Sequence, residues 1–136
     1  MNESLHLLVL TPSEVILDLS GLEHVTVEGP DGSLGIRAGH IDLISPLTRS
    51  VVYARTRKGE ARYAAVNRGV VAVSGGKIRI VTREAVVSEE RVYLENEVIR
   101  SFHQKADEER TSRTAFQKMR LRFMRRMLET ELGSGA

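Results

Sequence analysis

The sequence contains no cysteine and no tryptophan among its 136 residues. The absence of cysteine excludes a disulfide framework, thiol catalysis and zinc–thiolate sites. No apolar run approaches the roughly 18 residues that a transmembrane helix needs. The first residues, Met1–Ser4, lack the basic start and the apolar stretch of a signal peptide. These absences together predict a single-core protein of a reducing, intracellular compartment.

Acidic residues are missing from one segment near the C-terminus, although the net charge of the whole chain is only +2. Residues 111–128 contain no Asp or Glu, and their basic residues are Arg113, Lys118, Arg120, Arg122, Arg125 and Arg126. Such a one-sided segment indicates an acidic partner, because uncompensated cations attract negatively charged surfaces.

Short apolar runs separated by turn residues make up the first 87 residues. Residues 24–28 alternate apolar and polar side chains, which is typical of a strand with one buried face. They end at Gly29–Gly32, a Gly-Pro-Asp-Gly turn. Two hairpins are predicted further on. In the first, the turn 57–60 connects strands 51–55 and 62–66, and in the second, the turn 74–76 connects strands 70–73 and 77–81. Many short strands at this spacing favour an antiparallel sandwich or barrel.

The pattern becomes helical at Ser88, which we expect to cap a helix whose first turn carries Glu89 and Glu90. One apolar stripe follows at three- and four-residue spacings: Leu94, Val98, Ile99, Phe102 and Ala106. A second stripe comprises Phe116, Met119, Phe123 and Met127, with Lys118, Arg122, Arg125 and Arg126 on the other face.

We therefore expect helices at about residues 88–109 and 112–131. Residues 108–113 between them are polar but contain neither Gly nor Pro, so the pattern permits a helical hairpin or one long helix. The predicted organisation is a β-sandwich domain at 1–87 and an α-helical domain at 88–136.

Catalytic and cofactor sites are not predicted. The four histidines, His6, His24, His40 and His103, are scattered and show no metal-ligand spacing. The glycines between residues 29 and 39 are followed by no helix, which a phosphate cradle requires. Gly75-Gly76-Lys77 lacks the spacing of a P-loop. The alternative left open is a nucleic-acid-binding module that uses the basic C-terminal helix, against which stand the nearly neutral chain and the aromatic content of only 4%.

One segment, Val25–His40, carries a longer motif, V-T-V-E-G-P-D-G-S-L-G-I-R-A-G-H. It resembles the pattern V-x-V-x-G-x-x-G-x-L-G-I-x-P-G-H of the ε subunit of F-type ATP synthases. A second segment, Tyr63–Val73, resembles the apolar strand, glycine and strand that precede the final hairpin in that family. The order of strands followed by helices also agrees, so the resemblance extends over nearly the whole chain.

The resemblance implies a ten-stranded β-sandwich with a C-terminal two-helix hairpin. It also implies a non-catalytic subunit of the central rotor stalk, with the γ subunit, the ring of c subunits and the α/β catalytic head as partners. Such a subunit belongs to a proton- or sodium-translocating enzyme and lies on the cytoplasmic side of the bacterial inner membrane as a peripheral protein. Its C-terminal helices often restrain ATP hydrolysis.

Carried over by position, the resemblance implies partner contacts at three places. Gly32, Ser33 and Leu34 would face the c ring, and His40 and Asp42 would lie near γ. The basic face of the second helix would meet an acidic surface of the catalytic subunit through Lys118, Arg122, Arg125 and Arg126.

The chain departs from the family pattern at two points. Ala38 replaces the usual proline before Gly-His. Some members of the family bind ATP through I/L-D-x-x-R-A at the start of the first helix. The matching segment here, Val87–Val92, keeps Arg91 but lacks the Asp and the Ala, so we expect no ATP binding and no cofactor.

Overall fold

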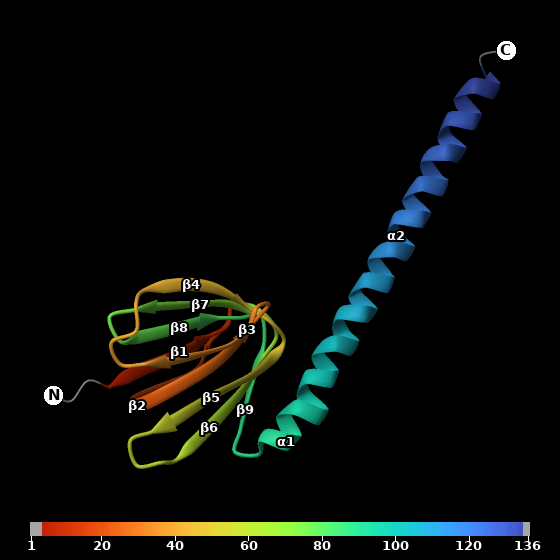
Figure 1. The fold of residues 1–136 in the computed structure, drawn as a ribbon. Helices are drawn as coiled ribbons and strands as arrows, with labels where there is room; N and C mark the ends of the chain where they lie inside the picture. Colours follow the sequence, from red (N-terminus) through yellow and green to blue (C-terminus); the bar gives the residue numbers. More distant parts are fainter. Residues whose placement is uncertain (1–3, 135–136) are drawn as a thin grey trace. The chain divides into compact units, whose positions relative to one another are not determined.

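The computed structural model describes the backbone of residues 4–134 and the side chains of residues 4–130. The chain divides into two compact units, residues 1–102 and residues 103–136. The described residues form nine strands followed by helix (Figure 1). The strands are β1 (Leu5–Leu10), β2 (Val15–Gly29), β3 (Gly32–Arg37), β4 (Leu43–Leu47), β5 (Ser50–Thr56), β6 (Ala61–Val66), β7 (Gly69–Ser74), β8 (Lys77–Val81) and β9 (Ala85–Ser88).

The strands pair in the order β4-β7-β8-β1-β2-β5-β6-β9, with β3 added to β2. The long strand β2 joins two layers, because its first half pairs with β1 and its second half pairs with β3 and β5. Figure 1 shows β4, β7, β8 and β1 in one layer and β5, β6 and β9 in the other. The predicted sandwich is confirmed. Among the described pairings, that of β1 with β8 is parallel, so the sandwich is not purely antiparallel as predicted.

Alternation along the strands places one set of side chains between the layers. In β1 the buried positions are Leu5, Leu7 and Val9, and in β8 they are Ile78 and Ile80. The rest of this core comes from the facing strands: Leu22, Val25, Val27, Ile36, Leu47, Val52, Ala54, Val66, Val71 and Val73. The core is aliphatic throughout, so apolar burial is what holds the two layers together.

Three of the predicted turns join neighbouring strands in the structure. The segment 29–32 closes the hairpin of β2 and β3, in which Gly29 pairs with Gly32. Residues 57–60 connect β5 to β6, and Gly75-Gly76 connects β7 to β8 across the Ser74–Lys77 pair. Turn chemistry was therefore a reliable guide to strand ends, because these short segments fix their own backbone.

Helical residues begin at Arg91 and continue as α1 (Arg91–Tyr93), the π-helical η1 (Leu94–Val98) and α2 (Ile99–Ser134). Leu94, Val98 and Phe102 are buried against Ala65 of β6, with Val51 and Tyr63 alongside. In a regular α-helix each four-residue step rotates a side chain by about 40° around the axis. The wider π turn holds more residues, which keeps these three side chains on one face.

The helix starts later than predicted. Ser88 is the last residue of β9, where it pairs with Tyr63, and Glu90 is the residue at the helix N-cap. The hydroxyl of Ser88 still accepts a hydrogen bond from the Glu90 N–H at 3.1 Å. Strand pairing of β9 with β6 therefore prevails over the local capping preference of Ser88.

The predicted two-helix hairpin and the ten strands are not confirmed, because the described residues show a single C-terminal helix and nine strands. No Gly or Pro interrupts residues 108–113, and the Thr114 hydroxyl donates to the Arg110 carbonyl at 2.9 Å within the same helix. Leu94, Val98 and Phe102, which belong to the apolar stripe of the predicted first helix, are already buried on β5 and β6. The predicted domain boundary after residue 87 stays a prediction.

Candidate functional site

An apolar row crosses the outer face of the layer made by β4, β7, β8 and β1. We call this the apolar row: Pro46, Val70, Val81, Leu10 and Val15, which are paired with one another from strand to strand. The exposed fractions of Val70, Val81 and Val15 are 43%, 55% and 55%. Ile44, 78% exposed, lies in the next row of the same face. A contiguous exposed apolar surface of this kind is typical of a protein interface.

The apolar row was not predicted from the sequence, although the residues of β7 indicate it. Residues 69–73 of β7 are Gly-Val-Val-Ala-Val, so apolar side chains occupy both faces of the strand. A strand with one solvated face normally alternates apolar and polar residues. The lack of alternation leaves apolar side chains on the outer face of β7 as well as in the core.

The motif residues lie beside this layer at the β2–β3 turn and the loop that follows β3. Gly32, Ser33 and Leu34 line a groove of about 350 Å³ together with residues 43–47. His40 and Asp42 lie in the loop between β3 and β4. Asp42 accepts a hydrogen bond from the Gly75 N–H at 3.2 Å, so its carboxylate ties this loop to the β7–β8 turn.

His40 is held locally as well. Its backbone N–H donates to the Arg37 carbonyl at 3.1 Å, and its Nδ1 lies 2.7 Å from the Ile41 carbonyl oxygen, which only accepts hydrogen bonds. The hydrogen therefore resides on Nδ1, which leaves Nε2 available to a partner.

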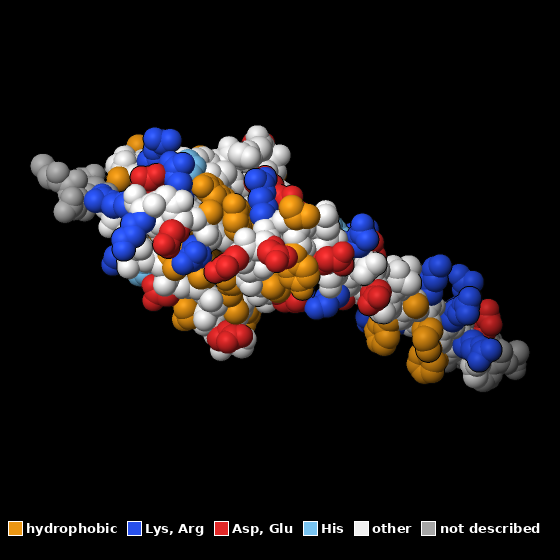
Figure 2. Space-filling model, turned by 90° about the horizontal axis from the view of Figure 1, so that it is seen from below, with side chains coloured by type: hydrophobic (Ala, Val, Ile, Leu, Met, Phe, Trp, Pro, Cys, Tyr) orange, Lys and Arg blue, Asp and Glu red, His pale blue; other side chains and the backbone are white. Residues whose placement is uncertain are grey.

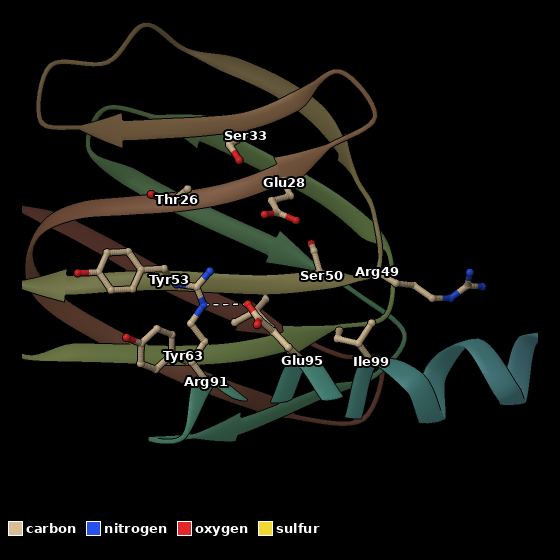
Figure 3. A pocket seen from close by; sticks show the side chains of 11 residues that line it. Thr26, Glu28, Ser33, Arg49, Ser50, Tyr53, Tyr63, Arg91, Glu95 and Ile99 are labelled. Atoms are coloured by element: carbon tan, nitrogen blue, oxygen red, sulfur yellow. Dashed lines mark hydrogen bonds and ion pairs between the residues drawn. The ribbon is translucent and has the colours of Figure 1, made fainter. Parts of the chain in front are cut away.

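A hollow of about 480 Å³ lies on the outer face of the other layer, beside the start of the helix (Figure 3). It is lined by Thr26, Glu28, Ser33, Arg49, Ser50, Val51, Tyr53, Tyr63, Arg91, Glu95 and Ile99. The rings of Tyr53 and Tyr63 lie 5.5 Å apart on β5 and β6. Polar groups converge here without an arrangement of nucleophile and base, so the hollow has the make-up of a binding surface.

Arg91, the residue kept from the ATP motif, is already engaged in this hollow. Its Nε donates to Glu95 Oε1 at 2.8 Å, and this hydrogen bond raises the pKa of Arg91 above its usual value. Figure 3 shows the guanidinium of Arg49 pointing away from this pair. The lining of the hollow thus contains two arginines, Arg49 and Arg91, and two carboxylates, Glu28 and Glu95.

The predicted tail residues all lie on α2, within the second compact unit. Lys118, Arg122, Arg125 and Arg126 are exposed, and so are the apolar side chains Phe116, Met119, Phe123 and Met127. Figure 2 shows Lys and Arg side chains gathered along the C-terminal part of the helix, with hydrophobic side chains emerging beside them. A basic helix with exposed aromatic and methionine side chains is typical of an element that binds an acidic partner.

The described residues contain neither a cluster of metal ligands nor a helix suited to span a membrane. No three His, Asp or Glu side chains among them gather closely enough to hold a metal ion. No helix in the described part of the chain has the length and apolar character needed to cross a membrane.

Comparison with known proteins gives matches over the sandwich and, for one relative, over nearly the whole chain. A family model described as ATP synthase, Delta/Epsilon chain, beta-sandwich domain matches residues 4–88. ATP synthase epsilon chain 2 of Cereibacter sphaeroides is 33% identical over 93 residues, which are 68% of this chain and 64% of that protein. ATP synthase epsilon chain 2 of Paraburkholderia xenovorans is 26% identical over 129 residues, 94% of this chain and 93% of that protein.

Two solved structures share the fold at low sequence identity. A chain of the Euglena gracilis mitochondrial ATP synthase, in a structure of OSCP, F1 and c-ring, superimposes with a TM-score of 0.60 at 24% identity, covering 65% of this chain and 56% of that chain. A chain of the Tetrahymena thermophila mitochondrial ATP synthase central stalk and c-ring gives 0.51 at 16% identity, covering 60% and 65%. The matched region thus spans less than two thirds of the Cereibacter relative and of both structures.

Proposed function

This chain belongs to the ATP synthase delta/epsilon chain family, and we propose that it is the non-catalytic ε subunit in the central stalk of an F-type ATP synthase. The observation that carries the proposal is the apolar row on the outer face of β4, β7, β8 and β1. A subunit that catalyses nothing needs permanent partner contacts, and an apolar sheet face provides them through burial.

We assign the apolar row to a γ-type stalk subunit. Its side chains are large and aliphatic, and they are fixed on paired strands, so they lose little conformational freedom on binding. His40 lies in the β3–β4 loop beside β4, with Nε2 available, and we include it in the same interface. Asp42 then contributes by holding that loop in place through Gly75.

Gly32, Ser33 and Leu34, which form one side of the groove, are assigned to the loops of the c ring. The tip of the β2–β3 hairpin exposes Pro30, Asp31 and Gly32, which allows close approach of another backbone. These two contacts together would transmit rotation of the ring to the stalk.

The basic face of α2 is assigned to an acidic surface of the α/β catalytic head. Lys118, Arg122, Arg125 and Arg126 are exposed and carry no compensating acid within residues 111–128. Pairing with carboxylates at a partly desolvated interface would hold the head and restrain ATP hydrolysis. The subunit itself would lack an active site, bind no ATP at Arg91, and lie on the cytoplasmic side of a bacterial inner membrane as a peripheral protein of a proton- or sodium-translocating enzyme.

The nucleic-acid-binding alternative has no support from the comparisons, and we do not propose it. The relatives and structures described above are named as ATP synthase components.

The test places a charge in the apolar row. We expect the full chain with Val70→Asp and Val81→Asp to lose co-assembly with the γ-type and c subunits, because both carboxylates would be buried at the interface without partners. Co-purification of the tagged chain with the other subunits measures this. Val92→Asp is the matched control, since Val92 is also exposed but lies on α1.

Retained assembly of the Val70 and Val81 variant, with circular dichroism showing an intact fold, would contradict the assignment of the apolar row. If the Val92→Asp control also loses assembly, any added charge on the surface prevents assembly. That result would also contradict the assignment of the apolar row.

A further inference from the structure

Three basic side chains face outward side by side on β3, β2 and β5, in the layer that does not carry the apolar row. We call Arg37, His24 and Arg55 the basic row. His24 is paired with Arg37 on one side and with Arg55 on the other. The neighbouring residues Ile36, Val25 and Ala54 are buried in the core, so alternation directs the basic row to the opposite face.

The arrangement costs stability in the isolated chain. Like charges directly opposite one another on neighbouring strands repel. Burial lowers the pKa of His24, and the positive charges of Arg37 and Arg55 lower it further. Burial and the two arginines therefore all favour the neutral form of the His24 imidazole over its charged form.

The side chains of the basic row are only partly paired by hydrogen bonds and ion pairs within the chain. Arg55 Nε lies 2.6 Å from Glu23 Oε1, and His24 Nε2 lies 2.6 Å from Thr26 Oγ1. His24 Nδ1 and Arg55 Nε are both buried and have no hydrogen-bond partner in the described part of the chain, so the contact of Arg55 with Glu23 is an ion pair without a hydrogen bond. Among the described residues, no carboxylate forms an ion pair with Arg37. One side of the basic row is therefore matched by an acid, and the other side is not.

Close packing fixes the imidazole in this position. Gly35 of β3 pairs with Thr26, and the ring of His24 lies over it. A Cβ at residue 35 would come within 3.2 Å of His24 Cε1, which is tighter than ordinary contact. The glycine therefore leaves room for the imidazole of His24 close to the backbone of β3.

We propose that the basic row of Arg37, His24 and Arg55 docks a carboxylate-bearing segment of a neighbouring protein subunit. The proposal rests on the proposed function, since it requires a chain that works inside an assembly, and it adds a contact that neither the motif residues nor the apolar row provides. Arg37 and Arg55 stand two strand spacings apart, about 10 Å, with His24 between them. An Asp or Glu side chain of a partner that approaches the sheet over His24 would be attracted by both guanidinium groups.

The chemistry of the surroundings favours a carboxylate of a protein. A carboxylate of the chain itself, Glu23, already forms an ion pair with Arg55 at 2.6 Å, while Arg55 Nε has no hydrogen-bond partner among the described residues. Nucleic acid or an anionic lipid surface rewards a broad field of cations, whereas here three side chains and one acid form a narrow site. Arginine is also the residue that matches a carboxylate with two parallel hydrogen bonds.

The experiment uses the complex assembled from the full chain and the other subunits of the same enzyme. Binding of the chain to that complex is measured at low and high salt for Arg37→Ala, Arg37→Lys and Arg100→Ala. We expect Arg37→Ala to weaken binding about tenfold at low salt and little at high salt, because the lost contact is a screened charge pair. Arg37→Lys keeps the charge and most of the affinity. Arg100, exposed on α2 within the same compact unit, is the matched control.

A photoreactive residue at position 37 then identifies what the basic row touches. A crosslinked protein peptide that contains Asp or Glu supports the proposal, and a crosslink to lipid or nucleic acid overturns it. Unchanged affinity of Arg37→Ala at low salt also overturns the docking proposal. If the variant with Val70→Asp and Val81→Asp loses assembly in that case, the proposed function still stands. The reverse pattern, a weakened Arg37→Ala with a normal Val70 and Val81 variant, keeps the docking site and removes the assignment of the apolar row.

Discussion

Gly69 begins β7 where the backbone of the neighbouring strand leaves no room for a side chain. A Cβ at this position would overlap the carbonyl oxygen of Val81 and come within 3.1 Å of Thr82 Cα. Its φ of +147° also lies in a region that residues with a side chain rarely adopt. Gly69, which lies in the family-like segment Tyr63–Val73, is therefore explained by the close contact of β7 with the end of β8. Two members of the apolar row, Val70 and Val81, lie next to this contact.

At the residue scale we expect Gly69→Ala to lower the free energy of unfolding by about 3 kcal/mol or more, from backbone strain and overpacking together. Urea denaturation followed by circular dichroism measures the change. Gly59→Ala is the control, because Gly59 also has a positive φ but no atom near its missing Cβ, so only about 1 kcal/mol should be lost there. Equal losses in the two variants would show that the contact with Val81 does not matter.

At the scale of the element, α2 combines exposed apolar side chains with a stretch of basic residues that contains no acid. Phe116 and Met119 are each 68% exposed, and the same stretch carries six basic residues and no acid between residues 111 and 128. Helix propensity and the absence of Gly and Pro explain why the backbone stays helical. They do not explain why the apolar side chains are exposed, since such side chains are stabilised only when another surface covers them.

We expect replacement of Arg122, Arg125 and Arg126 together by Ala to raise ATP hydrolysis by the assembled enzyme several-fold at low salt, without weakening assembly. The reason is that each interfacial charge pair contributes on the order of 1 kcal/mol to holding the catalytic head. Steady-state hydrolysis at low and high salt is the measurement. The control replaces Arg100, Arg110 and Arg113 by Ala on the same helix. Equal rates for parent and both variants would reduce the basic face to a solvated surface.

At the scale of the whole molecule, the first compact unit includes the start of the helix. Leu94 and Phe102 are almost completely buried, at 0% and 2% exposed, and they cover Ala65 on the outer face of β6. The helical segment 91–102 therefore belongs to the packing of the sandwich, although the family model ends at residue 88. The sandwich thus has two apolar outer surfaces, one covered by its own helix and one, the apolar row, left for a partner.

We expect a chain that ends at residue 102 to be more stable than one that ends at residue 88. Burial of Leu94, Val98 and Phe102 contributes about 1.5–3 kcal/mol for each side chain. The entropy lost on ordering the helical backbone opposes this burial, and we expect the burial to prevail and to raise the denaturation midpoint of the longer chain. Denaturant titrations of both chains measure it. Phe102→Ala in the longer chain should remove much of the gain, and identical midpoints for the two chain lengths would contradict the role of the segment.

The sequence by itself determined strands within β2, β5, β6, β7 and β8 and the turns at 29–32, 57–60 and 74–76, because apolar alternation and turn residues act over a few neighbouring residues. It also determined the basic and apolar faces of the helix and, through Val25–His40, the family. It did not determine β3, β4 or the full extent of β2 from Val15 to Gly29. Only the tertiary structure decided that β9 extends to Ser88, that Leu94 and Phe102 are used against β6, and that β1 pairs in parallel with β8. The apolar row and the basic row were decided there too. Each joins residues that are distant in the chain, such as Leu10 with Val81 and Arg37 with His24 and Arg55, and such pairings depend on strand register, which no local pattern records.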